Sequence, residues 1–420
     1  METTPISTPA PPTAQATTPT TAPAAAASAA PAPRGEAVAT TVIIKAMLGA
    51  AKHVSDLIFS PGRAPQVEAT GQLVEVPIPG MGKLTTEDTA RIAADLIGGS
   101  AQAVEKLRTQ GSCDISYSLA RLARFRVNIF TQRGSCAIVM RVIPNRVPTF
   151  ASLNLPPQLR DIMAVRNGIV LVTGPTGSGK SSTLAAIIDL INDEKAFHMI
   201  TIEDPIEFLH NHKKSTIHQR EVHSDTPSFA LALRAALRQA PKVILVGEMR
   251  DKETIEIALE AAETGHLVLS TLHTIDASKT VERIVGAFPL GDQHIIRTRL
   301  SKAFRYIVSQ RLAPRKDGDG RVAVIEILKS TMRTRDYVEK GESDGKSLLD
   351  AMRDGETEGM QDFDSELERM IRNGTLAVDV ALGYASNPGN LRLQIADFKE
   401  GDIATEAAKA TETVSSYTSK

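Results

Sequence analysis

The chain has few of the residues from which disulfide frameworks, zinc clusters and base-stacking channels are built. Of its 420 residues, two are cysteine, none is tryptophan and 4% are aromatic. Cys113 and Cys136 are too far apart for a CxxC pair and too few for a Cys₄ zinc site, so they fit buried thiols in a reducing compartment. The scarcity of aromatic residues argues against a stacking channel for single-stranded nucleic acid.

A surplus of charge and long apolar runs are also missing. The formal net charge is −1, so the chain has no basic excess for binding many phosphates, and we expect no nucleic-acid partner. No uninterrupted apolar run approaches the ~18–20 residues that span a bilayer. Residues 1–34 lack the basic start and the compact apolar centre of a secretory signal. These features predict a cytoplasmic protein.

Composition and periodicity divide the first third of the chain into three segments. Residues 1–38 are almost wholly Pro, Ala, Thr, Ser and Gln, and they predict a disordered tail because they offer little apolar surface to bury. Residues 39–145 contain a helical apolar stripe at 42–48 and a strand-like alternation at 125–130, so they predict a small α+β domain. Prolines mark residues 146–157 as a linker.

From residue 158 to residue 395 the pattern changes to short apolar runs that alternate with amphipathic helices. The runs at 169–173, 199–202, 243–246 and 266–270 predict an α/β domain with a mostly parallel sheet. We expect a helical part at the C-terminal end of this domain. Residues 396–420 are polar and predict a flexible tail.

Residues 174–181, Gly-Pro-Thr-Gly-Ser-Gly-Lys-Ser, form a complete Walker A loop between an apolar strand and a helix. The glycines allow a tight turn in which backbone N–H groups converge on phosphates, and the helix N-terminus adds positive potential. Lys180 can reach the β- and γ-phosphates, and Ser181 can ligate Mg²⁺. The sequence therefore predicts ATP and Mg²⁺ as ligands, bound by Gly174, Pro175, Thr176, Gly177, Ser178, Gly179, Lys180, Ser181 and Ser182.

Carboxylates follow two further strands. Glu248 ends one apolar run and stands where P-loop enzymes carry a metal-linked or water-activating acid. Glu203, Asp204 and Glu207 follow another run, and paired acids there can hold Mg²⁺ or orient the attacking water. Glu248 and Glu207 are therefore candidate catalytic acids. Glu203 is a candidate metal ligand beside Ser181, and Asp204 a candidate contact of the bound nucleotide.

Two histidines, His266 and His273, flank the run 267–272 in the same α/β unit. A neutral imidazole can sense a γ-phosphate by hydrogen bonding and change its partner when the phosphate leaves. Both histidines are therefore candidate nucleotide contacts, and the alternative is a structural role at the ends of a strand.

Arginines recur on the predicted strands of the first domain. They form either a solvated basic face or arginine fingers that reach a nucleotide in the same subunit or in a neighbouring one. The residues concerned are Arg124, Arg126, Arg133 and Arg141.

Together these motifs resemble the type II/IV secretion ATPase superfamily, and within it the PilT group of pilus retraction motors. Four stretches match in order: the Walker A loop 174–181, an acidic box at 201–207, a Walker B segment at 247–251 and a histidine box at 265–274. Residues 124–128 and 132–134 resemble markers of the family's N-terminal domain, and residues 359–364 and 387–393 resemble the retraction branch.

The resemblance implies a PAS-like N-terminal α+β domain followed by a RecA-like P-loop ATPase domain. It also implies a homohexameric ring, with ATP between the core of one subunit and the PAS-like domain of its neighbour. Arg126 and Arg141 match nucleotide-contacting arginines of that domain, and Glu248 matches the catalytic glutamate. The implied partners are an inner-membrane pilus platform protein and, indirectly, pilin, reached by peripheral association at the cytoplasmic face of the inner membrane machinery. The implied activity is pilus retraction in twitching motility.

Departures from the pattern leave alternatives open. Residues 332–338 do not reproduce the Ala-Ile-Arg-Asn-Leu-Ile segment of the main retraction motors, so a PilU-like accessory ATPase is one alternative. A pilus assembly or type II secretion ATPase is another, although these usually add a long N-terminal domain and a four-cysteine zinc insertion. A VirB11-like ATPase and a hexameric nucleic-acid motor fit less well. A nucleotide-binding scaffold without turnover is disfavoured by the acids around the P-loop.

Overall fold

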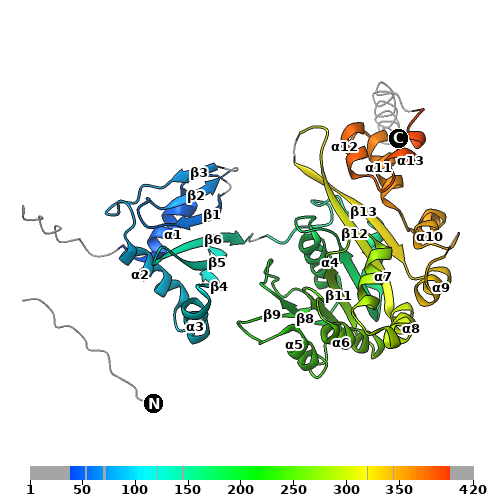
Figure 1. The fold of residues 1–420 in the computed structure, drawn as a ribbon, viewed down its shortest axis with the longest axis horizontal. Helices are drawn as coiled ribbons and strands as arrows, with labels where there is room; N and C mark the ends of the chain where they lie inside the picture. Colours follow the sequence, from blue (N-terminus) through cyan, green and yellow to red (C-terminus); the bar gives the residue numbers. More distant parts are fainter. Residues whose placement is uncertain are drawn as a thin grey trace, which may run out of the picture.

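The fold comprises two β-sheets with separate helical layers, as the computed structural model in Figure 1 shows. The structure describes residues 38–397 except 53, 70, 71, 121, 144, 145, 319 and 344. The predicted tail at 1–38 lies outside the described residues except for Val38, and the predicted tail at 396–420 lies outside them beyond residue 397. The mixed α/β fold class predicted from the sequence is confirmed.

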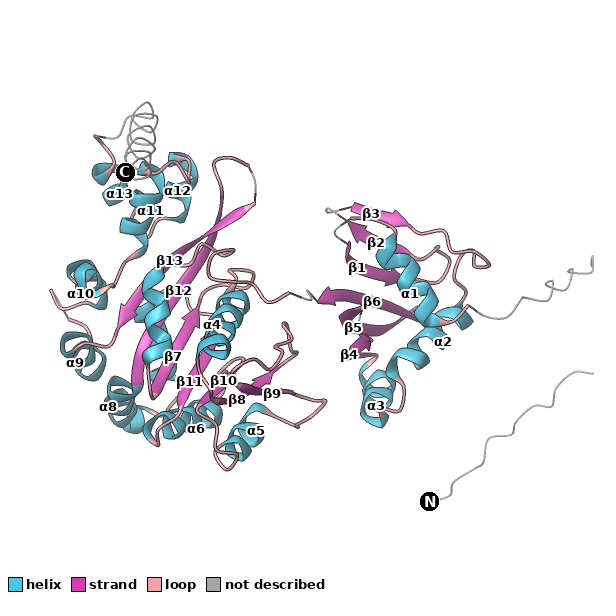
Figure 2. Cartoon of the chain, turned by 180° about the vertical axis from the view of Figure 1, so that it is seen from behind, coloured by secondary structure: helices cyan, strands magenta, loops and turns pink. Residues whose placement is uncertain are grey.

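The N-terminal domain is a six-stranded antiparallel sheet in the order β3-β2-β1-β6-β5-β4, with α1 and α2 on one face (Figure 2). Strand β5 alternates as the sequence predicts, because Phe125, Val127 and Ile129 are buried under the helices while the residues between them face the other way. The elements are α1 (Thr40–Gly49), β1 (Val54–Phe59), β2 (Gln66–Ala69), β3 (Gln72–Glu75), α2 (Thr86–Ile97), α3 (Ala101–Gln110), β4 (Ser112–Leu119), β5 (Ala123–Gln132) and β6 (Ser135–Ile143).

The second domain is a seven-stranded sheet in the order β13-β12-β7-β11-β10-β8-β9, and β13 is its antiparallel strand. All six residues of β7 are buried because helices cover both faces, which explains its continuous apolar sequence. The elements are η1 (Pro157–Ala164), β7 (Gly168–Thr173), α4 (Lys180–Glu194), β8 (His198–Glu203), β9 (Thr216–Glu221), α5 (Phe229–Ala236), β10 (Val243–Val246), α6 (Lys252–Glu263), β11 (Leu267–Leu272), α7 (Ala277–Gly286), η2 (Leu290–Asp292), α8 (Gln293–Ala303), β12 (Phe304–Pro314) and β13 (Arg321–Lys329).

A group of short helices follows β13, and its last members pack against the far end of β12 and β13 (Figure 1). Arg311 of β12 anchors this packing, since its guanidinium lies 3.7 Å from the centre of the Phe363 ring. The elements are α9 (Met332–Lys340), α10 (Leu348–Asp354), η3 (Glu356–Glu358), α11 (Phe363–Arg372), α12 (Val378–Tyr384) and α13 (Pro388–Gln394).

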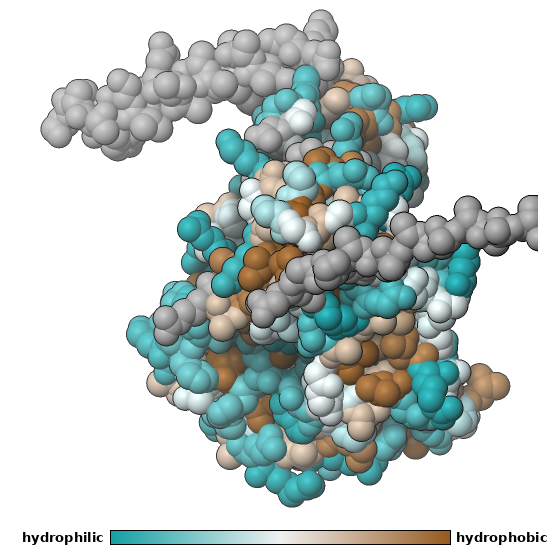
Figure 3. Space-filling model, turned by 90° about the vertical axis from the view of Figure 1, so that its left-hand side faces the viewer, coloured by the Kyte–Doolittle hydropathy of each residue, from teal (hydrophilic) through white to brown (hydrophobic). Residues whose placement is uncertain are grey.

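Across the described ranges, none of the helices combines the length and the apolar composition that a bilayer crossing requires. The face of the molecule in Figure 3 mixes hydrophilic residues with smaller hydrophobic patches.

Candidate nucleotide site

The P-loop connects β7 to α4 and depends on glycine at two points. Gly174 and Gly179 have φ of +143° and +91°, a region that residues with a side chain rarely adopt. A Cβ on Gly174 would lie 2.3 Å from the carbonyl oxygen of Gln310, and a Cβ on Gly179 would lie 2.8 Å from Nε2 of the same residue. The loop therefore follows this tight path because no side chain occupies these two positions.

Gln310 of β12 hydrogen-bonds to the P-loop and to the first turn of α4. The sequence did not predict this residue as part of the site. Its Nε2 donates to the carbonyl oxygen of Ser178 (2.7 Å), and its Oε1 accepts from Oγ1 of Thr183 in the first turn of α4 (2.8 Å). The side chain is buried and both of its polar ends are paired. The available signal was the polar pair Ser309–Gln310, which directly follows the apolar run 306–308 of this strand.

The ammonium group of Lys180 folds back on the loop. Its Nζ donates to the carbonyl oxygens of Gly174 (2.9 Å) and Pro175 (3.1 Å) and lies 3.5 Å from Nδ1 of His273. Oγ1 of Thr176 lies 3.4 Å from the same ring nitrogen. The structure therefore brings His273, from the carboxyl end of β11, directly to the P-loop.

Glu248 completes this group from the end of β10. Its Oε1 lies 3.4 Å from Nε2 of His273, and its Oε2 lies 2.7 Å from a guanidinium nitrogen of Arg250. Burial raises the pKa of Glu248, but Arg250 and His273 outweigh burial and bring the pKa below its usual value. Burial lowers the pKa of Lys180, and the nearby carboxylates of Glu248 and Glu207 oppose this shift. An ionised acid therefore faces the lysine at neutral pH.

Buried hydroxyl groups fix the ends of these strands relative to one another. Oγ1 of Thr271 donates to the carbonyl oxygen of Gly247 (2.6 Å), and Oγ of Ser270 donates to that of Val246 (2.7 Å). Both bonds link β11 to the end of β10, so the backbone that carries Glu248 is held against the backbone that leads to His273.

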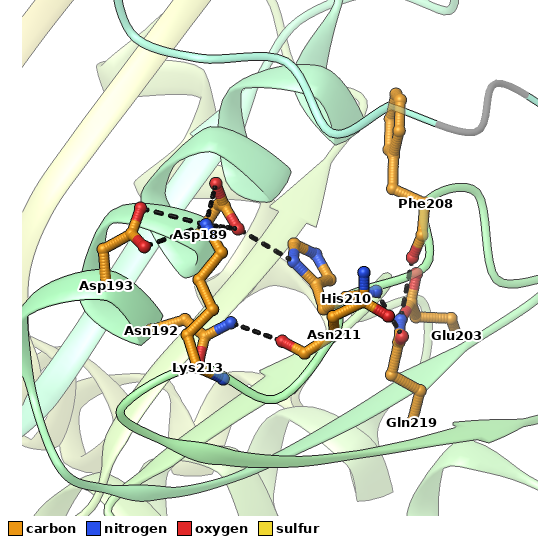
Figure 4. A network of polar contacts seen from close by, with 9 residues as sticks. All are labelled: Asp189, Asn192, Asp193, Glu203, Phe208, His210, Asn211, Lys213 and Gln219. Atoms are coloured by element: carbon orange, nitrogen blue, oxygen red, sulfur yellow. Dashed lines mark hydrogen bonds and ion pairs between the residues drawn. The ribbon is translucent and has the colours of Figure 1, made fainter.

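One of the acids that the sequence predicts at the site, Glu203, already has hydrogen-bond partners within its own domain. Oε1 of Glu203 accepts from Oγ1 of Thr201 (2.6 Å) and from Nε2 of Gln219 (3.1 Å), as Figure 4 shows for Gln219. Burial raises the pKa of Glu203, which disfavours its charged form. Asp204 and Glu207 are exposed, and Glu207 is the one whose charge acts on Lys180. Glu203 is therefore poorly suited to be a direct metal ligand.

The chain that follows these acids is tied to the P-loop helix (Figure 4). Lys213 pairs with Asp189 and Asp193 of α4, at 2.9 Å in each case, and Nδ2 of Asn192 donates to the carbonyl oxygen of Asn211 (2.7 Å). These contacts hold residues 211–213 against the carboxyl-terminal half of α4.

A cleft of about 670 Å³ lies beside the P-loop and is of a size typical for ligand sites. Its walls are loop residues 175–178 on one side and, on the other, side chains that include Arg311, Leu312 and Tyr384. Oγ of Ser178 is buried without a hydrogen-bond partner, so the loop offers an unused polar group. A tight glycine turn, an unpaired hydroxyl and the amino end of α4 together fit a phosphate group.

Magnesium fits this site only together with a bound phosphate. Lys180 is the first residue of α4, and Ser181 and Ser182 follow it in the first turn beside the loop. Within the part of the chain that the structure describes, no group of three His, Cys, Asp or Glu residues could hold a metal ion. Mg²⁺ is commonly bound by one or two protein oxygens, phosphate oxygens and water, and Ser181 can supply such an oxygen.

Comparison with known proteins identifies the family. The family model of the type II/IV secretion system protein matches residues 99–379. The chain belongs to this family. It is 41% identical to the "Type IV pilus retractation ATPase PilT" of Pseudomonas aeruginosa over 81% of this chain and 97% of that protein. It is 37% identical to the "Type IV pilus ATPase PilU" of the same organism, over 84% of this chain and 90% of that protein.

A solved structure supports the same assignment. The crystal structure of the pilus retraction motor PilT with bound ADP matches with a TM-score of 0.75 and 41% identity, over 83% of this chain and 98% of that one. The chain is therefore an ATPase of the type II/IV secretion system family, and the predicted order of an N-terminal domain and a P-loop ATPase domain is confirmed.

In this family member His266 lies away from the P-loop of its own subunit. It precedes β11, whereas His273 follows it, so the two imidazoles stand at opposite ends of a six-residue strand, ~20 Å apart. Nδ1 of His266 lies 3.0 Å from the carbonyl oxygen of Ala261, which is a local contact to α6. Of the two predicted nucleotide contacts, the structure therefore brings His273 to the P-loop and leaves His266 at the opposite end of the strand.

The arginines of the N-terminal domain divide into two kinds. Arg126 and Arg141 are opposite each other on β5 and β6 and are exposed, and Nε of Arg141 donates to the buried carboxylate of Asp56 (2.9 Å). Among the described residues, neither forms a hydrogen bond or ion pair with the P-loop. Arg124 is instead partly buried and forms an ion pair with the buried Glu221 of the ATPase domain.

Glu326 of β13 is a buried acid beneath the site that sequence reasoning missed. It lies opposite Ser309 of β12 and accepts from the backbone nitrogen of Ala277, the first residue of α7 (2.9 Å). Oγ of Ser309 also accepts from Oγ1 of Thr173, the last residue before the P-loop (3.2 Å). Glu326 therefore links the start of α7, which follows His273 in the chain, through Ser309 to the end of β7, which precedes the P-loop. Burial raises the pKa of Glu326 to about 7.

We expect Glu326→Gln to remove a pH dependence of stability. Because the folded-state pKa is raised, the fold favours the protonated acid, and wild-type stability falls by ~1.4 kcal/mol per pH unit between the unfolded pKa and about pH 7. The melting temperature of Glu326→Gln relative to wild type should therefore rise between about pH 5 and pH 7 and level off above. A difference that is constant with pH would mean that Glu326 titrates normally.

Proposed function

We propose that this ATPase is a motor that couples ATP hydrolysis to type IV pilus retraction. The observation that carries the proposal is the convergence of Lys180, Glu248 and His273 at a P-loop in a chain 41% identical to a pilus retraction ATPase over nearly that protein's full length. The same similarity favours a cytoplasmic protein that acts peripherally on an inner-membrane pilus platform protein and, through it, on pilin.

Each residue of the site has a distinct role in this proposal. The backbone N–H groups of the P-loop and Lys180 bind the phosphates, and Mg²⁺ held by Ser181 would neutralise charge on the β- and γ-phosphates. Glu248, which is ionised, orients the attacking water and accepts its proton. His273 hydrogen-bonds to the γ-phosphate and turns to Glu248 when that phosphate has left. Glu207 is the second acid that could take the role of Glu248, because its charge also reaches Lys180.

We also propose a homohexamer in which Arg126 and Arg141 contact the nucleotide of a neighbouring subunit. Their exposure, and the location of their sheet in a domain separate from the P-loop, support an action between subunits. An arginine on the transferring phosphoryl group can increase the rate ~10³-fold or more.

Mixed rings test this arrangement. Subunits with Arg126→Ala and subunits with Lys180→Ala should each be inactive, but rings reassembled from both should regain part of the ATPase activity, because a Lys180→Ala subunit can still lend its arginine. The measurement is steady-state ATPase of dissociated and reassembled rings whose composition is verified by mass spectrometry. Activity no higher than that of the parents would place the arginines in the same subunit or in a structural role.

An accessory retraction ATPase is the second candidate. Its support is the sequence of α9, which departs from the main retraction motors and leaves Met332 strongly exposed. Deleting the gene and counting pili distinguishes the candidates. Excess pili with complete loss of twitching motility support the principal retraction motor, and a partial loss supports the accessory one. An absence of pili would support assembly and contradict both.

A further inference from the structure

The edge strand β9 contacts the N-terminal domain through one buried carboxylate. Glu221, the last residue of β9, is 8% exposed at its side chain. Its Oε1 accepts from Oγ of Ser116 (2.6 Å), and its Oε2 accepts from a guanidinium nitrogen of Arg124 (2.5 Å). Ser116 lies on β4 and Arg124 on β5, so both donors come from the other domain.

The same carboxylate holds the acidic segment of its own domain. Oε2 of Glu221 accepts from the backbone nitrogen of Ile206 (3.1 Å), which is the residue directly before Glu207. Gln219, two residues earlier on β9, donates to Glu203 (3.1 Å) and to the carbonyl oxygen of Phe208 (2.9 Å) (Figure 4). Strand β9 therefore fixes the segment 203–208 at several points, and one of these points is shared with the N-terminal domain.

The Glu221 carboxylate is sensitive to the position of the N-terminal domain, because that domain supplies its positively charged partner. Arg124 is the positive partner of a carboxylate that is almost entirely removed from solvent. If Arg124 withdraws, the buried charge is left without compensation, and the carboxylate must turn toward water or rearrange its remaining bonds. Either response weakens the bond to Ile206, because that bond shares Oε2 with the arginine.

We propose that Glu221 is a positioning residue that couples docking of the N-terminal domain to the placement of Glu207 at the nucleotide site. The inference rests on the proposed function only in assigning Glu207 to that site. When the N-terminal domain moves, Arg124 loosens its hold on Glu221, Ile206 loses its acceptor and the acidic segment shifts. A domain movement thereby changes the position of Glu207 in the same subunit.

Amide hydrogen exchange of residues 206–210 tests the coupling in the full-length chain with Arg124→Leu. We expect exchange there to be about 10-fold faster than in wild type, because a hydrogen bond to a charged group is lost. We expect kcat for ATP to fall about 10-fold while KM changes less than about 2-fold, since Lys180 and the P-loop are untouched. Ser116→Ala, which removes a single donor, should produce the same changes to a smaller extent and serves if the leucine variant folds poorly.

Arg63→Leu is the matched control. Arg63 belongs to the same domain and pairs with Glu75 at 3.6 Å, but both side chains are more than half exposed. This variant removes the same charge from the domain and should leave both exchange and kcat unchanged. If Arg63→Leu changed amide exchange and kcat as much as Arg124→Leu, the cause would be a general loss of stability of the domain, and the proposal would be overturned.

A double variant with the two charges exchanged tests the ion pair between the domains separately from the hydrogen bond that Glu221 accepts from the backbone nitrogen of Ile206. The variant Arg124→Glu with Glu221→Arg restores opposite charges across the domains but presents a donor to the backbone nitrogen of Ile206. We expect residues 206–210 to remain fast-exchanging in it. Recovered protection there, or unchanged exchange in Arg124→Leu, would overturn the proposal. Accelerated exchange with unchanged kcat would instead remove Glu207 from the proposed nucleotide site and refute its positioning.

Discussion

Replacing Lys180 with alanine is expected to abolish ATP hydrolysis and to remove most of the nucleotide affinity. The ammonium group lies at the P-loop, where it donates to two loop carbonyl oxygens, so it is within the loop that would bind the phosphates. Loss of one directed cation or donor from a phosphate or oxyanion site lowers rates about 10²–10³-fold, and loss of affinity adds to this.

Two measurements check this expectation. Fluorescent-nucleotide binding should give a much larger Kd, and phosphate release should fall to the background of the assay. Lys302→Ala is the matched control, since Lys302 is exposed on α8 and should be indistinguishable from wild type. Undiminished hydrolysis in Lys180→Ala would contradict the assignment of the P-loop as the ATPase site.

Glu248→Gln is expected to separate binding from turnover. The amide keeps the shape of the side chain but cannot accept a proton from water, so kcat should fall about 10²–10⁴-fold while ATP binding is retained. The negative charge next to Lys180 is also lost, so affinity for the anionic nucleotide should stay equal or increase.

Single-turnover hydrolysis with a parallel binding titration measures the two quantities separately. Glu256→Gln, at an exposed position on α6, controls for the loss of one acid from this region. A Glu248→Gln enzyme within a few-fold of wild type would transfer the role to Glu207, the other acid whose charge reaches Lys180.

The elements around the P-loop could be predicted because their signals are local. The runs at 169–173 and 243–246 are continuously apolar because helices cover both faces of the sheet, and the structure has β7 and β10 there. Glycine spacing within eight residues determines the turn of the P-loop. The run predicted at 266–270 was displaced, because β11 spans Leu267–Leu272 and leaves His266 outside it.

Which side chains meet at the site could be predicted only in part. Parallel strands end at one edge of a sheet, so Glu248 and His273 could be expected near the loop from the direction of their strands alone. Gln310 and Glu326 could not, because their strands are distant in sequence and the order of strands in the sheet decides that β12 lies beside β7. The bond that Gln219 donates to Glu203 could not be predicted either, because it depends on the pairing of β8 with β9.

The sequence by itself determined the chemistry of this protein: a phosphate-binding loop, acids at the ends of buried strands and membership of a family of ATPases. These follow from short-range rules, because backbone conformation and strand polarity depend on neighbouring residues. The tertiary structure decided which acids and histidines reach the loop, and that Arg124 pairs with the buried Glu221 while Arg126 stays exposed. Such pairings depend on strand order and domain packing, in which residues almost 100 positions apart are brought into contact.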